Sequence, residues 1–313
     1  MKKILSSIPA VVAMMTMTTV FTACSSDGDG QQPSDLAKLI IDAEKSSYID
    51  VDGEENGTRA IALSGDESSI NTSWIGSDVV TVFKNDWQSQ IGTLSPDVQT
   101  AHDKGFPANR TKLEGVITYN NLKAGDKLDL IYPRSTWDYT GQKGTIADIS
   151  KNFDYITTSV NVVYIDKDNT SNPVYSTSAF FGKAEQTIVK FTLVNADGTA
   201  LTVPELSITT AGNQLVKKCS LNGKATEKGG DLIVKPESST NVFYVAIRND
   251  NEGKDQYTLT AKQADGKVLT YTKSDVELVR GNFKKIKVKM KFYDDTYTER
   301  DPYYNEDGEE VWE

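Results

Sequence analysis

The stretch Phe283–Phe292, FKKIKVKMKF, decides the fold class, because lysine and apolar residues alternate strictly along it from Lys285 onward. Successive side chains of a β-strand point to opposite faces of the sheet, so this pattern predicts a strand with one face in water. Similar runs precede it, and turn signals such as Asn222-Gly223 separate them. The earlier runs are Ile61–Leu63, Asp78–Phe83, Gly115–Tyr119, Lys127–Tyr132, Val160–Ile165, Thr187–Val194, Leu206–Thr209, Asp231–Val234, Val242–Ile247, Tyr257–Thr260 and Val268–Tyr271.

Many short strands separated by turns predict an all-β protein, built here as two antiparallel β-sandwiches in tandem. The length of 313 residues suits two domains or one large one. We place the seam in the loop Phe181–Gln186, because a new series of strands starts after it. The predicted sandwiches then cover residues 57–182 and 183–313.

Residues 34–46 show a different periodicity from the rest of the chain. Apolar residues at positions 36, 39, 40 and 43 match the spacing of one helical face, and Ser34 is a suitable N-cap. This spacing favours a short helix, although the run at 36–43 could also be extended.

The charge and the inventory of ligands exclude several classes of function. The net charge of −10 argues against nucleic acid as a partner, because phosphate binding needs clustered Lys and Arg. One histidine and two cysteines are too few for a zinc finger or most transition-metal sites. The segment that starts at Asp166 begins like a calcium loop, but Ser171 and Thr177 replace the required Gly and Glu, so a hairpin turn is favoured.

Catalytic residues are not evident, so we predict that the protein is not an enzyme and uses no cofactor or metal. The single histidine, His102, lies in a polar stretch that indicates a surface loop rather than a triad base. Cys219 lies in a strand-like run and is interpreted as a buried structural thiol. The 44 acidic residues leave a glycosidase pair of carboxylates open, because spacing in sequence does not give distance in space.

The N-terminus has the features of an export signal. Lys2 and Lys3 precede an apolar stretch from Ile4 to Phe21 that contains no charge. The stretch ends at Ala23-Cys24 in a pattern that resembles the bacterial lipobox, with cleavage between the two residues and acylation (palmitate among the chains) of Cys24. Residues 1–23 are then a signal peptide and residues 24–56 a lipidated flexible leader. Acidic residues after Cys24 resemble a surface-export signal of Gram-negative lipoproteins, so we expect an exposed outer-membrane protein.

Four places in the chain resemble the fimbrillin family, whose Mfa-like lipoproteins are subunits of type V pili. They are Thr58-Arg59-Ala60 before the first sandwich, Trp74–Phe83, Leu128–Pro133 with its Tyr-Pro ending, and Leu278–Phe283 leading into the last strand. The second departs from the family pattern, because Ser77 separates Gly76 from Asp78. The resemblance implies transthyretin-like sandwiches and a structural or adhesive role in a fimbrium.

The resemblance also implies how the subunit assembles. In the family, a protease cuts after an Arg near the N-terminus, a strand is released, and a strand from another subunit fills the groove. Arg59-Ala60 fits the position of the cut, and the released strand lies in Tyr48–Asp52 or in residues 36–43. The acid-rich tail 293–313 with Pro302 is a poor donor strand, which favours a tip or anchor position over the shaft.

A second hypothesis is a surface lipoprotein that binds glycans and never polymerises. It uses exposed aromatic side chains as a platform for sugars of host or bacterial surfaces, or for a surface protein. The candidates are Trp87, Trp137 and the tyrosines of the tail, Tyr293, Tyr297, Tyr303 and Tyr304.

Replacing the lipidation residue tests the export prediction. Cys24→Ala should move the precursor from the membrane fraction to the soluble periplasmic fraction, because the acyl chains supply its strong membrane affinity. Fractionation followed by immunoblotting measures the shift. A variant that stays on membranes after a high-salt wash contradicts the lipoprotein assignment.

Overall fold

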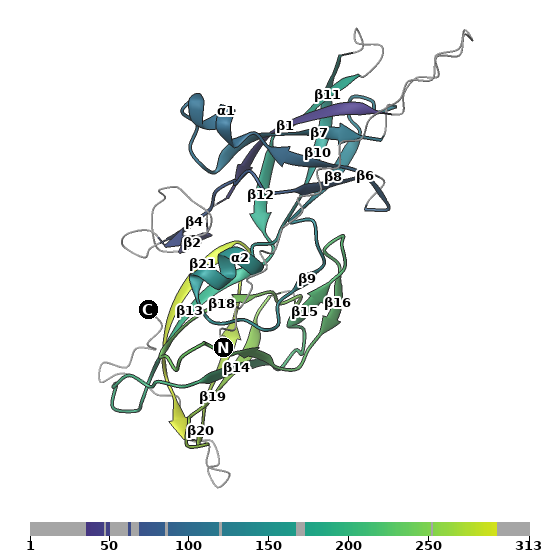
Figure 1. Ribbon diagram of the computed structural model, residues 1–313. Coiled ribbons are helices and arrows are strands. Elements are labelled where there is room, and N and C mark those ends of the chain that lie inside the picture. Colours follow the sequence, from purple (N-terminus) through teal and green to yellow (C-terminus); the bar gives the residue numbers. More distant parts are fainter. Residues whose placement is uncertain are drawn as a thin grey trace, which may run out of the picture. The chain divides into compact units, whose positions relative to one another are not determined.

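The computed structural model describes residues 36–46, 48–50, 62–63, 69–84, 87–118, 121–166, 173–251 and 253–292 (Figure 1). Strands dominate these residues, which confirms the all-β class. The helices among them are short, α1 (Val98–Asp103) and α2 (Ile146–Asn152). Within the described part of the chain, no helix has the length and apolar character needed to cross a membrane.

The largest sheet closes on itself. Its strands follow the order β11-β1-β12-β10-β8-β5-β6-β7, and a further pairing joins β1 to β7. The ring β1–β12–β10–β8–β5–β6–β7–β1 is therefore continuous, with β11 also paired to both β1 and β10. The strands are β1 (Ala37–Lys45), β5 (Val80–Lys84), β6 (Ser89–Pro96), β7 (Arg110–Ile117), β8 (Lys127–Tyr132), β10 (Ile156–Asp166), β11 (Val174–Thr177) and β12 (Phe180–Ala184).

The helix predicted at residues 34–46 is wrong, because residues 37–45 form the strand β1. Alternate side chains of β1, from Ala37 to Lys45, are buried, as the period of two requires. The apolar residues at 36, 39, 40 and 43 fit a helix equally well, so local spacing did not separate the two structures. The edges of β7, β11 and β12 decide the matter by binding the backbone of β1.

The loop predicted at Phe181–Gln186 is also corrected, since its first four residues belong to β12. Phe180 is fully buried while Phe181 is 65% exposed, so the strand alternates across the sheet. Gly182 pairs with Lys45 of β1. A Cβ atom at Gly182 would collide with the ring of Phe180 and with Ile156, so the close packing here requires glycine.

The other strands form three smaller sheets. The six-stranded one is mixed rather than purely antiparallel as predicted, because β13 and β2 both run parallel to β21. The first sheet is mixed too, since β1 runs parallel to β11 and β12. The sheets have the orders β18 (Val242–Ile247), β13 (Thr187–Val194), β21 (Asn282–Lys289), β2 (Tyr48–Asp50), β4 (Ser69–Asn71), β3 (Ala62–Leu63); β17 (Leu232–Val234), β14 (Glu205–Thr210), β19 (Asp255–Lys262), β20 (Val268–Val276), β22 (Lys291–Phe292); and β16 (Ala225–Lys228), β15 (Val216–Cys219), β9 (Trp137–Asp138).

Buried side chains gather in two clusters. One takes its members from the strands of the ring, and the other includes members from the six-stranded and five-stranded sheets. Trp137, Tyr139, Ile149, Phe153 and Tyr155 belong to the second cluster although they precede the seam predicted from the sequence. The domain boundaries and the tandem-sandwich architecture therefore stay predictions.

Two neighbouring isoleucines test the strand assignment of β1. Ile41 is fully buried and Ile40 is only partly buried on the other side of the strand. Ile41→Ala should lower the free energy of unfolding by about 2–5 kcal/mol, and Ile40→Ala by at most about 1 kcal/mol. Urea unfolding followed by circular dichroism measures both. The helical alternative reverses the order, because position 40 would then face the core.

Candidate functional site

Strand β1 fills a slot in the closed sheet. Its side chains at Ala37, Leu39, Ile41 and Ala43 are buried and belong to the core cluster of the ring. The alternate residues point the other way, and two of them form surface ion pairs. Lys38 Nζ lies 2.7 Å from Glu114, and Glu44 lies 3.4 Å from Arg110 Nε.

Both edges of β1 are hydrogen-bonded. On one side, residues 37–44 pair antiparallel with residues 117–110 of β7. On the other side, residues 38–40 pair parallel with β11 and residues 43–45 with β12. The chain beyond β1 continues the pattern, since the Ser46 N–H donates to the Gly182 carbonyl at 3.0 Å. Removing β1 would therefore open the ring along two edges.

A buried lysine closes the end of the slot. The side chain of Lys45 is inward-facing and only 1% of the residue is exposed. Its ammonium group lies 3.1 Å from Asp78 Oδ2 and 3.8 Å from Asp154 Oδ2, and it donates to the Ser73 carbonyl at 3.0 Å. We call these groups, with the two aromatic rings described next, the Lys45 box.

Two aromatic rings complete the Lys45 box. The Lys45 Nζ atom lies 3.9 Å from the ring centroid of Tyr132 and 4.4 Å from that of Trp74, within the range of cation–π attraction. The two rings pack edge to face at 5.7 Å. Trp74 also meets Phe180 of β12 at the same centroid distance, so the box is built into the core of the ring.

Asp78 is held in place by groups other than Lys45. The Tyr132 hydroxyl donates to Asp78 Oδ1 at 2.8 Å, and the Ile75 N–H donates to Oδ2 at 3.0 Å. Burial raises the pKa of the Tyr132 phenol far above its ordinary value, and the carboxylates of Asp154 and Asp78 raise it further. Tyr132 is therefore a neutral donor, and Lys45 supplies the cation that offsets the buried carboxylates.

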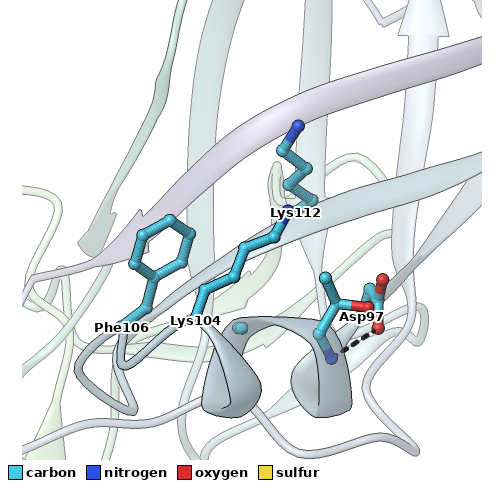
Figure 2. A pocket seen from close by; sticks show the side chains of 6 residues that line it. Asp97, Lys104, Phe106 and Lys112 are labelled. Atoms are coloured by element: carbon cyan, nitrogen blue, oxygen red, sulfur yellow. Dashed lines mark hydrogen bonds between the residues drawn. The ribbon is translucent and has the colours of Figure 1, made fainter.

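Two hollows lie on the surface of the described residues. One, of about 290 Å³, is an open depression lined in part by Asp78 and Tyr132. Figure 2 shows the other, which is lined by Asp97 at the start of α1, by Lys104 and Phe106 after its end, and by Lys112 of β7. There the Asp97 carboxylate accepts a hydrogen bond from the Thr100 N–H at 3.1 Å, and hydrogen bonding from the Thr100 side chain and from this N–H lowers the pKa of Asp97. Its volume of about 10 Å³ has room for roughly one water molecule.

The residues predicted for export and processing lie outside the described residues. This holds for Ala23, Cys24, Arg59 and Ala60. Two of the four motifs that resemble fimbrillins do meet in the structure. The motif at 74–83 supplies Trp74 and Asp78, and the motif at 128–133 supplies Tyr132, all to the Lys45 box.

Sequence reasoning missed Lys45 itself. A signal was present, since Ala37, Leu39, Ile41, Ala43 and Lys45 alternate at the period of a strand. The helical interpretation concealed it, because Lys45 then falls beyond the apolar face. A lysine at the end of a run of alternate, inward-facing apolar residues is the signal that could have indicated a buried cation.

The other singled-out residues have structural roles. Cys219 is buried, as predicted, and burial raises the pKa of its thiol to about 11 even with Arg248 nearby. His102 is exposed as expected, but it lies on α1 rather than in a loop. Trp137 is fully buried and stacks on Tyr155 at 4.8 Å, so it cannot serve as a platform for sugars. Among the described residues, no cluster of His, Cys, Asp or Glu could hold a metal ion.

Comparison with known proteins gives structural neighbours alone. No protein-family model matches the chain, and no curated protein matches it by sequence. A putative cell adhesion protein from Bacteroides ovatus is 13% identical over 82% of this chain and 94% of its own, with a TM-score of 0.42. A fimbrial assembly protein from Parabacteroides distasonis is 12% identical, with coverage of 82% and 93% and a TM-score of 0.41.

A tip fimbrial protein, Mfa3 from Porphyromonas gingivalis, is 9% identical over 81% of this chain and 95% of its own, with a TM-score of 0.39. These three neighbours are described as adhesion or fimbrial proteins.

Removing the charge of Lys45 should destabilise the protein strongly. Lys45→Met keeps most of the side-chain volume but leaves Asp78 buried without its cation, which should cost about 3–5 kcal/mol in the free energy of unfolding. Lys38→Met, on the exposed face of the same strand, should cost at most about 1 kcal/mol. Urea unfolding measures both losses.

Adding Asp78→Asn to Lys45→Met is the second comparison. It should recover part of the loss, because the buried carboxylate is then gone. Equal losses in Lys45→Met and Lys38→Met would show that the Lys45 box is not a stabilising ion pair.

Proposed function

We propose that this protein is a structural subunit of a bacterial surface fimbrium that assembles by strand exchange. The observation that carries the proposal is the position of β1, an alternating strand at the N-terminal end of the described chain that closes the ring of the first sheet. A strand of this kind can be exchanged for another of like pattern, because backbone hydrogen bonds and alternating pockets do not depend on chain connectivity.

Arg59 lies on the chain between β1 and most of the ring. The strands β1 (Ala37–Lys45) and β2 (Tyr48–Asp50) precede it, and β5 is the first ring strand after it. A cut between Arg59 and Ala60 would therefore separate β1 covalently from every strand with which it pairs. The longer β1, with eight residue pairs to β7 against the two that β2 makes with β21, is the exchanged strand in this proposal.

Cutting alone should not release β1. Its Leu39 and Ile41 are buried, and each contributes roughly 1.5–3 kcal/mol through burial. An empty slot would expose apolar core and leave two rows of backbone N–H and C=O groups open. Exchange therefore proceeds as replacement, in which an incoming strand takes over the contacts of β1.

The remaining parts of the proposal follow from the sequence. Acylation at Cys24 anchors the precursor to the outer membrane, and once Arg59 is processed, replacement of β1 frees the folded part from that anchor. The subunit acts by assembly with other fimbrial subunits rather than by catalysis. The acidic tail with Pro302 favours a tip or anchor position, because such a segment is a poor donor strand.

Blocking the cut tests the proposal. An Arg-specific protease should cut wild type between Arg59 and Ala60, after which the protein should assemble with partner subunits. Arg59→Ala should stay intact and monomeric while unfolding at the same urea concentration as wild type. N-terminal sequencing identifies the cut, and size-exclusion chromatography with light scattering measures assembly.

Two control variants separate cleavage from charge. Arg59→Lys keeps the positive charge but removes the protease site, so it should behave as Arg59→Ala does. Arg110→Ala removes an exposed arginine of β7 and should be processed like wild type. Polymerisation of Arg59→Ala, or trimmed wild type that stays monomeric with partner subunits present, would refute strand exchange at this site.

A further inference from the structure

Departure of β1 takes the cation out of the Lys45 box and leaves the rest of the box behind. Asp78, Tyr132 and Trp74 all follow Arg59 in the chain, as do Asp154 and the Ser73 carbonyl. Only Lys45 lies on the strand that leaves. A buried carboxylate that has lost its cation is strongly unfavourable, so the slot without Lys45 requires a replacement charge.

We propose that the strand that replaces β1 must carry a lysine at the position of Lys45. This inference rests on the proposed function, since it names the chemistry of the partner in strand exchange. The incoming strand needs four alternating apolar residues and then the lysine, with small residues at the outer positions of Ala37 and Ala43 and large ones at Leu39 and Ile41. Because the slot requires this lysine, it would distinguish the correct strand from other strands with alternating apolar residues.

The geometry of the box favours lysine over arginine. The ammonium group is a compact donor, and here it has aromatic ring centroids at 3.9 and 4.4 Å together with oxygen partners at 3.0 and 3.1 Å. A guanidinium is planar and larger, and it binds carboxylates best in a two-pronged geometry. In this box one Asp78 oxygen already receives the Tyr132 hydroxyl and the other receives the Ile75 N–H, so a two-pronged contact would compete with donors already in place on both oxygens.

The chain's own tail does not meet this requirement. Residues 293–313 contain one cation, Arg300. The alternate positions before it are Thr298, Thr296, Asp294 and Phe292, and those after it are Pro302, Tyr304, Glu306 and Gly308. Neither direction offers four alternating apolar residues. The proposed occupant is therefore a strand of another subunit that has the alternating pattern and the lysine of β1, not the tail of a second copy.

Peptide competition in the full chain tests the inference. A protease site inserted after Gly57 in the Cys24→Ala chain lets the unacylated protein be nicked whether or not Arg59 is a natural site. The nicked protein is unfolded in urea and refolded with excess fluorescent peptide of residues 36–46, LAKLIIDAEKS. Refolding removes any barrier from slow release of the original strand, and fluorescence anisotropy measures the peptide bound.

Peptides with single substitutions then measure how strongly the slot prefers lysine at position 45. The residues of the protein that line the slot are left unchanged. The Lys45→Met peptide should bind about 100-fold more weakly than the unsubstituted one, and the Lys45→Glu peptide should not compete at all. The Lys38→Met peptide is the matched control, because Lys38 forms only an exposed pair with Glu114, and it should bind within about fivefold. In an Asp78→Asn protein the difference in affinity between the unsubstituted peptide and the Lys45→Met peptide should shrink.

The outcomes separate the inference from the proposed function. If the unsubstituted peptide binds and the Lys45→Met peptide binds equally well, the lysine requirement is overturned and strand exchange stands. If the unsubstituted peptide fails to bind, strand exchange at this slot fails and the inference falls with it. Strong preference for lysine at position 45, together with indifference at position 38, supports both.

Discussion

The buried ion pair between Lys45 and Asp78 is the constraint on which the closed sheet depends. Burying a charge is tolerable only when a partner and hydrogen bonds accompany it, and here the ammonium meets Asp78, the Ser73 carbonyl and two aromatic rings. These groups come from the end of β1, the segment before β5 and the end of β8. If the chain folded with these segments apart, buried charges would be left unpaired. The ring therefore closes favourably only when the three segments are in place.

The same pair fixes the register of β1. A slip by one residue would turn Leu39 and Ile41 away from the core and is excluded by burial alone. A slip by two residues keeps apolar residues facing inward, so burial opposes it far less. It would, however, place Ala43 or Ser47 at the box in place of Lys45. The contact between Lys45 and Asp78 thus selects one register among those that the alternating pattern allows. A lone polar residue in the core of a coiled coil fixes the register in the same way.

The box also gives a physical meaning to residues that first stood out only as a resemblance. Trp74 and Asp78 lie in one motif and Tyr132 ends another, and their side chains converge on one cation. In a subunit that exchanges its first strand, such a convergence serves twice. It holds β1 in the precursor, and it sets what a replacing strand must offer. Stability of the precursor and choice of partner then arise from one interaction.

Alternation and turn residues by themselves determined that the chain is all-β, and β13 (Thr187–Val194) and β18 (Val242–Ile247) have the predicted bounds. These signals are local and need no knowledge of the partner strand. Tertiary structure alone decided that residues 37–45 are a strand, because their spacing suits a helix as well and the edges of β7, β11 and β12 settle it. The Lys45 box was beyond sequence reasoning for the same reason. Lys45 and Asp78 are 33 residues apart, and only folding brings their charges within reach.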